Sequence, residues 1–371
     1  MPGKPRRIYL DFNASTPVAP EVIAVMRSLL EEPYGNPSSG HWAGTPAREA
    51  VEKARMQVAQ LMGCQANEIV FTSGGSEANN NALKGVFFAS KKADAHIITT
   101  QVEHPAIINP CKFLEQLGAT VTYLRVDGFG RVDPDDVRRA LRPSTILISV
   151  MHANNEVGTI QPIKEIAKIA TEAGVLLHSD AAQSLGKIAC NVRELGVDLL
   201  SVAGHKLYAP KGVGALYIRE GVSVEPLIHG ASHESSRRAG TENVLLDAAL
   251  GAACHLARTW SGTDSIRGLR DLFWDLLRNK FGDRVVLNGH PVERLPNTLN
   301  ISFVKQVGAE VLGLLSGVAA STGSACHAGS VELSPVLRAM GVPPEVGMGA
   351  IRFSLGRTTT REEIEAVVGE L

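Results

Sequence analysis

The stretch from residue 175 to residue 206 reads VLLHSDAAQSLGKIACNVRELGVDLLSVAGHK, and it contains two short apolar runs that each lead into polar residues. Val175–Leu177 precedes Asp180, and Leu199–Val202 precedes Lys206. Short apolar runs of this kind are typical of buried strands. Because α/β folds bind ligands beyond the carboxyl ends of their strands, we expect Asp180 and Lys206 to meet at one edge of one sheet.

Five further short runs rich in β-branched residues are expected to be strands of the same sheet. Helical stretches separate most of the runs, and this alternation is typical of a mostly parallel α/β sheet. The last run follows Leu199–Val202 after a loop that is too short for a helical crossover, so this pair is expected to be antiparallel. The prediction is a seven-stranded α/β sheet with further strands at residues 69–71, 96–99, 121–124, 146–149 and 213–218, and helices at residues 78–88, 105–117, 134–141 and 163–173.

The character of the chain changes after Thr241. Two long helical stretches, at residues 243–259 and 265–281, are followed by strands near 285–287 and 299–303 and by a final helix from Arg361. This pattern predicts a smaller α+β domain. We expect a large domain over residues 16–255 and a small domain made of residues 1–15 and 256–371, with the functional site between them.

The composition limits the possible functions. Of 371 residues 44% are hydrophobic, enough for a substantial core, and Lys+Arg 37 against Asp+Glu 38 leaves a net charge of -1. Without a basic excess we expect no nucleic-acid partner. Without an apolar run of membrane-spanning length we expect a cytoplasmic protein that does not enter a membrane. The five cysteines are scattered and lack C-x-x-C spacing, which argues against a disulfide framework and against a zinc or other metal site.

A phosphate site is indicated where the strand at residues 69–71 leads into a helix. Two glycines precede Ser76 at this junction, so the backbone can turn tightly and the helix can direct free N–H groups at a bound anion. Gly75 and Ser76 are the candidate binding residues. An ordinary helix cap explains the small residues equally well when they are considered alone.

The order of Asp180 and Lys206 along the chain supports a chemical role for both residues. Asp180 lies among apolar and small residues, so its burial requires a partner, such as a protonated pyridine nitrogen. It could also simply cap the next helix. A desolvated lysine can act as the amine nucleophile of Schiff-base chemistry, although a lone lysine at a strand end is usually solvated. A phosphate-type turn, Asp180 and Lys206 fall in sequence on one sheet edge, which favours the chemical interpretation.

Three other positions look better suited to chemistry than to packing. His104 precedes a proline at a strand end, where its ring could stack on an aromatic group or move protons, or could simply belong to a turn. Asn155 lies in a row of polar residues after another strand. Arg352 alternates with apolar residues, and its planar fork fits a substrate carboxylate, although a structural ion pair is the alternative.

Cys326 lies within a run of small residues, at positions 321–330, whose composition is typical of a mobile loop. A cysteine chosen at random is expected to be inert. Here the adjacent His327 can raise the fraction of thiolate, which is the reactive form, so we expect Cys326 to be reactive.

Taken together, these motifs resemble the PLP-dependent cysteine desulfurases and selenocysteine lyases, which have the fold type I architecture of class V aminotransferases; PLP is pyridoxal 5′-phosphate. The resemblance spans nearly the whole chain, and the motifs are specific because they occur together and in order. They are Tyr9–Ala14, Gly35–Ser39, Phe71–Glu77, His178–Gln183, Gly204–Lys206 and Ile351–Arg357.

The resemblance implies a role for each candidate residue. Lys206 would bind PLP as a Schiff base and move protons, with His104 as a further catalytic residue stacked on the ring and Cys326 as the catalytic thiol. Around the ring, the implied contacts are Asp180 to the pyridine nitrogen and Gln183 and Asn155 to the ring hydroxyl. At the phosphate they are Gly75, Ser76, Ala203 and His205, with Thr241 from the second subunit of a homodimer. Asn155 and Arg352 would bind the substrate.

Ala203 departs from the family pattern, because many desulfurases have a serine there. The missing hydroxyl removes one hydrogen bond to the phosphate, at a cost of about 1 kcal/mol of cofactor affinity if nothing replaces it.

The resemblance implies conversion of L-cysteine to L-alanine, with transfer of sulfur to Cys326 as a persulfide. A sulfur-acceptor protein would then receive the sulfur for iron–sulfur cluster or other sulfur-cofactor assembly. The nearest alternative is a selenocysteine lyase acting on L-selenocysteine, since both activities use the same PLP residues. Less favoured are a class V aminotransferase, which needs no thiol, and a scaffold or sulfur-relay protein without turnover.

Overall fold

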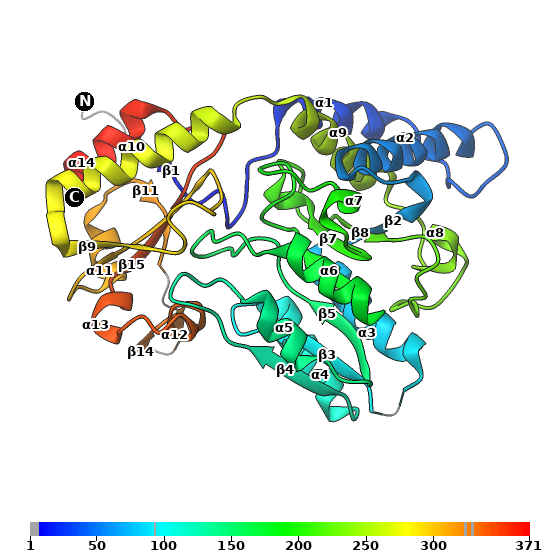
Figure 1. The fold of residues 1–371 in the computed structure, drawn as a ribbon. Helices are drawn as coiled ribbons and strands as arrows, with labels where there is room; N and C mark the ends of the chain where they lie inside the picture. Colours follow the sequence, from blue (N-terminus) through cyan, green and yellow to red (C-terminus); the bar gives the residue numbers. More distant parts are fainter. Residues whose placement is uncertain (1–6, 93, 323–324, 328–329) are drawn as a thin grey trace.

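The computed structural model describes residues 7–92, 94–322, 325–327 and 330–371, and of residues 325–327, 330 and 331 it describes the backbone alone. Its centre is a seven-stranded sheet in the order β2-β8-β7-β6-β5-β3-β4 (Figure 1). The strands are β2 Ile69–Thr72, β3 His96–Thr100, β4 Thr120–Leu124, β5 Thr145–Ser149, β6 Leu176–Asp180, β7 Leu199–Ala203 and β8 Gly214–Ile218.

Strand β8 runs antiparallel to both of its neighbours, and the remaining pairs are parallel. The predicted fold class, the seven strands and the antiparallel last pair are therefore confirmed. The register pairs Asp180 with Ser201, so the carboxyl ends of β6 and β7 lie side by side. This register brings the residues that follow both strands to one edge.

Adjacent residues within a strand belong to two different apolar clusters, because side chains alternate between the faces of a sheet. Leu199 packs with α3 and α4, whereas Leu200 packs with the cluster that contains α6. In α6 the buried residues recur at the spacing of one helical face, from Ile163 to Ala170. The helices around the sheet are α3 Gly75–Ser90, α4 Pro105–Gln116, α5 Pro134–Ala140, α6 Ile163–Ala173 and α7 Val192–Leu195.

Helices near the start of the chain complete this part of the structure, and the sequence analysis made no assignment for them. They are α1 Pro20–Glu31 and α2 Gly44–Met62, and they pack against α9 Val244–Thr259. The turns η1 Ala66–Glu68 and η2 Gly204–Lys206 and the short helix α8 His233–Ser236 lie between them in the chain.

A second, antiparallel sheet has the order β12-β15-β10-β9. Its strands are β9 Val285–Asn288, β10 Thr298–Phe303, β12 Ser321–Thr322 and β15 Ala350–Ser354, covered by α10 Thr263–Phe281 and α14 Arg361–Glu370. The start of the chain joins this unit: β1 Ile8–Tyr9 pairs with β11 Val318–Ala319, and Leu10 is buried in the same core as Phe273 and Phe353 (Figure 1). The N-terminal segment therefore crosses from the second sheet to the first.

The remaining elements lie between β11 and β15. They are β13 Ala325–His327 and β14 Ser330–Glu332, which form a two-stranded antiparallel hairpin, and the short helices α12 Pro335–Ala339 and α13 Pro344–Gly347. Turn η3 Gly282–Arg284 and helix α11 Gly308–Leu314 precede them. Sequence composition predicted a loop at residues 321–330, whereas the described backbone there forms short paired strands. None of the helices in the described ranges combines the length and apolar character that crossing a membrane requires.

Candidate functional site

A cavity of about 620 Å³ opens beyond the carboxyl ends of β6 and β7. The predicted residues that line it are Gly75, Ser76, His104, Asn155, Asp180, Gln183, Ala203, His205, Lys206 and Arg352. Residues from the first sheet and from the second sheet thus meet at one site. Ligand sites of α/β proteins commonly lie in this position, beyond the carboxyl ends of the strands.

Lys206 ends the η2 turn that follows β7, and its side chain is turned back toward the N-terminal segment. Its amine donates hydrogen bonds to the backbone carbonyls of Asn13, at 2.5 Å, and Ala14, at 2.7 Å. Burial, together with the nearby Arg352, lowers the pKa of Lys206 to about 8, while the carboxylates of Asp11 and Asp180 oppose this shift. Near neutral pH the neutral, nucleophilic amine is therefore far more populated than in an exposed lysine.

Asp180 is the last residue of β6 and is 7% exposed. One carboxylate oxygen accepts from the side-chain amide of Asn79 at 2.7 Å, and the other accepts from the backbone N–H of Ala182 at 2.8 Å. Asp180 therefore caps the next turn and also presents a buried carboxylate to the cavity. Each oxygen keeps acceptor capacity toward a cationic N–H in the cavity.

His104 caps the start of α4, because its ring Nδ1 accepts from the backbone N–H of Ala106 at 3.1 Å. The His104 side chain is otherwise exposed and borders the cavity. Burial, together with the charge on Lys206, lowers the pKa of His104, and Asp180 opposes this shift. The ring is therefore favoured in its neutral form, which suits a flat contact with an aromatic ligand.

The end of the cavity at α3 has the features of an anion site. Gly74 precedes this 16-residue helix with φ 146, and no side chain caps the helix. The ring Nδ1 of His205 is buried and lacks a hydrogen-bond partner within the described structure. The methyl group of Ala203 lies beside Gly75, since a Cβ added at Gly75 would stand 3.1 Å from it. At this point the wall of the cavity is apolar.

The amides of Asn155 and Gln183 differ in how far they are already engaged. The side-chain oxygen of Asn155 is buried without a described partner. In Gln183, the Nε2 group donates to the carbonyl of Asn13 at 2.9 Å and the Oε1 atom accepts from Lys187 at 2.9 Å. Asn155 therefore has an unused acceptor at the cavity, whereas Gln183 is held in place by protein contacts.

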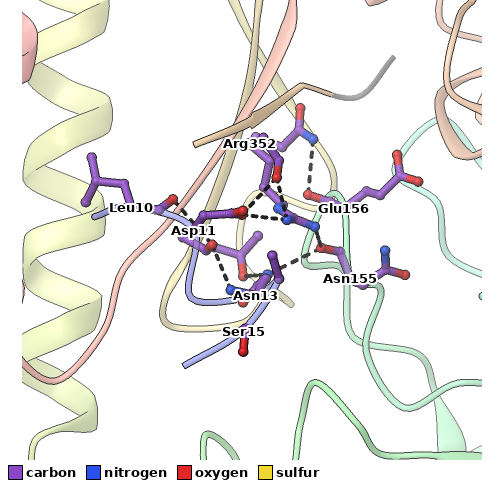
Figure 2. A network of polar contacts seen from close by, with 12 residues as sticks. Leu10, Asp11, Asn13, Ser15, Asn155, Glu156 and Arg352 are labelled. Carbon is purple, nitrogen blue, oxygen red and sulfur yellow. Dashed lines mark hydrogen bonds and ion pairs between the residues drawn. The ribbon is translucent and has the colours of Figure 1, made fainter. Parts of the chain in front are cut away.

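Arg352 lies in β15, and Figure 2 shows its guanidinium between Asp11 and Asn155. It forms an ion pair with Asp11 at 2.7 Å and donates to the backbone carbonyl of Asn155 at 2.9 Å and to Ser321 at 3.1 Å. Its Nε atom is buried without a described partner. Arg352 therefore combines the structural ion pair with a donor group at the wall of the cavity.

Two predicted site residues are not placed in this cavity. Thr241 is exposed and does not line it within its own chain. The side chain of Cys326 lies outside the described residues; the backbone places Cys326 in β13, opposite Val331.

Asn13, Asn79, Asp11 and Lys187 also contribute to the site, although no sequence pattern indicates them. Asn13 and Asp11 lie within the motif Tyr9–Ala14, and Asn79 lies in the helix expected at residues 78–88. Each is a polar residue with apolar or small neighbours in the sequence. Many surface residues have such neighbours, so this feature does not identify a site residue. Within the described residues, no group of histidine, cysteine and acidic side chains could hold a metal ion.

Residues 8–367 match the model of the family described as Aminotransferase class-V. The chain is 51% identical over 363 residues to the cysteine desulfurase IscS of Dictyoglomus turgidum, which covers 97% of this chain and 92% of that protein. The chain belongs to the class V aminotransferase family, and within it to the cysteine desulfurases.

Solved structures agree with this assignment to the cysteine desulfurases. A NifS-like protein superposes with a TM-score of 0.91 and 37% identity, covering 98% of both chains. The structure of SspA in complex with cysteine superposes with a TM-score of 0.85 and 37% identity, covering 94% of this chain and 98% of that one. The predicted family, fold and enzyme class are thus confirmed, and the selenocysteine lyase alternative is not favoured.

Glu103, next to His104, is a buried carboxyl that accepts from Thr100 at 2.8 Å and from the backbone of Met151 at 2.9 Å. Burial raises its pKa to about 8. Since an unfolded glutamate has a pKa of about 4.3, the folded protein holds this proton more tightly, and the resulting stability is lost as pH rises from about 5 to about 8. We expect Glu103→Gln to gain stability relative to wild type by up to about 1.4 kcal/mol per pH unit over this window.

Chemical denaturation of both proteins between pH 5 and pH 8 measures this difference. The exposed Glu310 provides the control, and Glu310→Gln should follow the wild-type curve. Parallel curves for Glu103→Gln and wild type would show that Glu103 is ionised throughout.

Proposed function

We propose that the chain binds PLP on Lys206 and converts L-cysteine to L-alanine, with sulfur passing to Cys326 as a persulfide. The observation that carries the proposal is the juxtaposition of a buried amine of lowered pKa with a buried carboxylate, Asp180, in one cavity that ends at an uncapped helix. Relatives of this chain are named cysteine desulfurases, and one superposed structure contains cysteine.

The residues of the cavity fit PLP. The uncapped start of α3 and the unpartnered Nδ1 atom of His205 suit the phosphate. The Asp180 carboxylate suits a protonated pyridine nitrogen, and the unpartnered side-chain oxygen of Asn155 suits the ring hydroxyl. The amine of Lys206 can condense with the aldehyde. Each polar group of the cofactor thus has a complement among the described residues.

PLP, when bound, supplies an acceptor for the electron pair released at the substrate Cα. Asp180 would keep the pyridine nitrogen protonated, and the neutral ring of His104 would pack against the cofactor. The amine of Lys206 would take the Cα proton of the substrate and return protons to the product. Arg352 holds the substrate carboxylate through its guanidinium, which its contacts with Asp11 and Asn155 keep in place.

Cys326 decides the identity of the reaction. Its thiolate attacks the sulfur of the substrate, forming a sulfur–sulfur bond as the carbon–sulfur bond breaks. The electron pair of the broken bond stays with carbon, which is protonated and leaves as part of L-alanine. The sulfur remains on Cys326 as a persulfide, and no external oxidant or reductant is needed. We propose a sulfur-acceptor protein, such as one that assembles iron–sulfur clusters, as its recipient.

A homodimer is also part of this proposal. Thr241 would complete the phosphate site of the partner subunit, which is in accord with its absence from the cavity of its own chain. The aromatic residues Tyr34 and Trp42 are 77% and 79% exposed and contact each other edge to face. Large exposed aromatic residues of this kind favour a protein interface.

We further propose the division into a domain of residues 16–255 and a domain of residues 1–15 and 256–371. Its support is the cluster of buried apolar residues that joins Ile8 and Leu10 to residues of α10, β10, β15 and α14.

Replacing Cys326 tests the persulfide step. We expect Cys326→Ala to lower sulfide release from L-cysteine, measured with a thiol reductant, by at least about 100-fold, while the visible absorption of bound PLP stays unchanged. Mass spectrometry after brief exposure to L-cysteine should find one added sulfur on Cys326 of the wild type. Cys64, whose pKa burial raises to about 12, provides the control: Cys64→Ala should keep full activity. Undiminished sulfide release by Cys326→Ala would refute this step.

The lowered pKa of Lys206 predicts how the apoprotein takes up PLP. Because only the neutral amine condenses with the aldehyde, the uptake rate should rise with pH up to about 8 and then level off. Stopped-flow absorption between pH 6 and pH 10.5 measures it, and Lys206→Ala should show no covalent uptake. A rate that keeps rising to about pH 10.4, the value of an ordinary lysine, would contradict the buried environment of Lys206.

A further inference from the structure

Lys187 is a second lysine close to the reactive amine, and none of the steps above uses it. It follows Gln183 by four residues in the segment after β6, and its amine donates to the side-chain oxygens of Gln183 at 2.9 Å and Asn13 at 3.1 Å. Both acceptors are buried residues at the wall of the cavity that contains Lys206.

The surroundings of Lys187 are unusual for a lysine. Lys187, like Lys206, borders a second, small cavity of about 30 Å³, and no acidic residue is among the described residues that line this space. Burial, together with the charges of Lys206 and Arg352, lowers the pKa of Lys187 to about 7. A buried cation without a carboxylate costs stability, so its presence indicates a function beyond packing.

The contacts of Lys187 lead directly to Lys206. The carbonyl of Asn13, the residue whose side chain Lys187 holds, accepts from Lys206 at 2.5 Å and from Gln183 at 2.9 Å. Lys187, Gln183 and Asn13 therefore form a closed ring of hydrogen bonds, and Lys206 joins it through the carbonyl of Asn13. If the side chain of Asn13 or Gln183 were mobile, the carbonyl of Asn13, which orients the amine of Lys206, would be held less firmly.

We propose that Lys187 is a positioning residue of the active site. Through its hydrogen bonds to the side chains of Asn13 and Gln183, it fixes the orientation and the electrostatic environment of Lys206. The inference rests on the proposed binding of PLP at Lys206. Arg352 acts on both lysines, Asp11 and Asp180 act on Lys206, and Arg357 borders the small cavity. The titratable rings of His104 and His205 also face Lys206.

The pH titration of the visible absorption of bound PLP tests this role, because its midpoint reports the proton on the nitrogen of Lys206. Lys187→Met removes both hydrogen bonds and a cation, which favours the protonated form. We expect the midpoint to rise by roughly half a pH unit or more, kcat to fall roughly ten-fold, and KM for L-cysteine to stay within about two-fold.

Two further variants serve as controls. Lys168 is an exposed lysine on α6, and Lys168→Met should keep the wild-type midpoint. Lys187→Arg keeps a cationic donor and should return the midpoint toward the wild-type value. If Lys187→Met does not fold, Lys187→Gln, which keeps an amide donor but no charge, carries the same expected rise in the midpoint.

An unchanged midpoint in folded Lys187→Met, or in Lys187→Gln where Lys187→Met does not fold, would overturn the proposal, even if the melting temperature fell, because loss of packing alone does not move the proton on Lys206. Failure of the proposed function would look different. The wild-type protein, once separated from unbound PLP, would then show no visible absorption.

Discussion

Asn13 is fully buried, and every polar group it has is used to connect the two sheets at the cavity. Toward the first sheet, its carbonyl accepts from Lys206 and Gln183, and its side-chain oxygen accepts from Lys187. Toward the second sheet, its backbone N–H donates to Ser354 and its side-chain nitrogen donates to Thr298. Leaving one such buried group unpaired would cost about 1–3 kcal/mol. The position of Lys206 relative to Arg352 depends on this residue.

The charges of the site follow from the same arrangement. Burial lowers the pKa of both lysines, the charge of Arg352 adds to this effect on both, and the charge of Lys206 adds to it on Lys187. Asp11 neutralises Arg352 through a direct ion pair, and Asp180 is held by Asn79. The neutral, reactive form of the Lys206 amine is consequently far more populated near physiological pH than in an exposed lysine.

The sequence was sufficient to predict the central sheet and the meeting of Asp180 with Lys206. Both follow from local patterns, because apolar runs define the strands and parallel strands end at one edge. The partners of Arg352 could not be found in this way, since Asp11 is 341 residues away in the chain. Lys187 was missed for a related reason. The segment around Lys187 has no periodic pattern of apolar residues, so a lysine there is expected to be solvated. Only the fold brings it next to Asn13.

Covalent capture of PLP most directly tests whether Lys206 is the reactive amine. The PLP-loaded protein would be reduced with borohydride and digested, and the peptides would be analysed by mass spectrometry. A pyridoxyl group is expected on Lys206 and none on Lys187, although both lysines border the same small cavity. A label on Lys187, or no label on either lysine, would contradict this expectation.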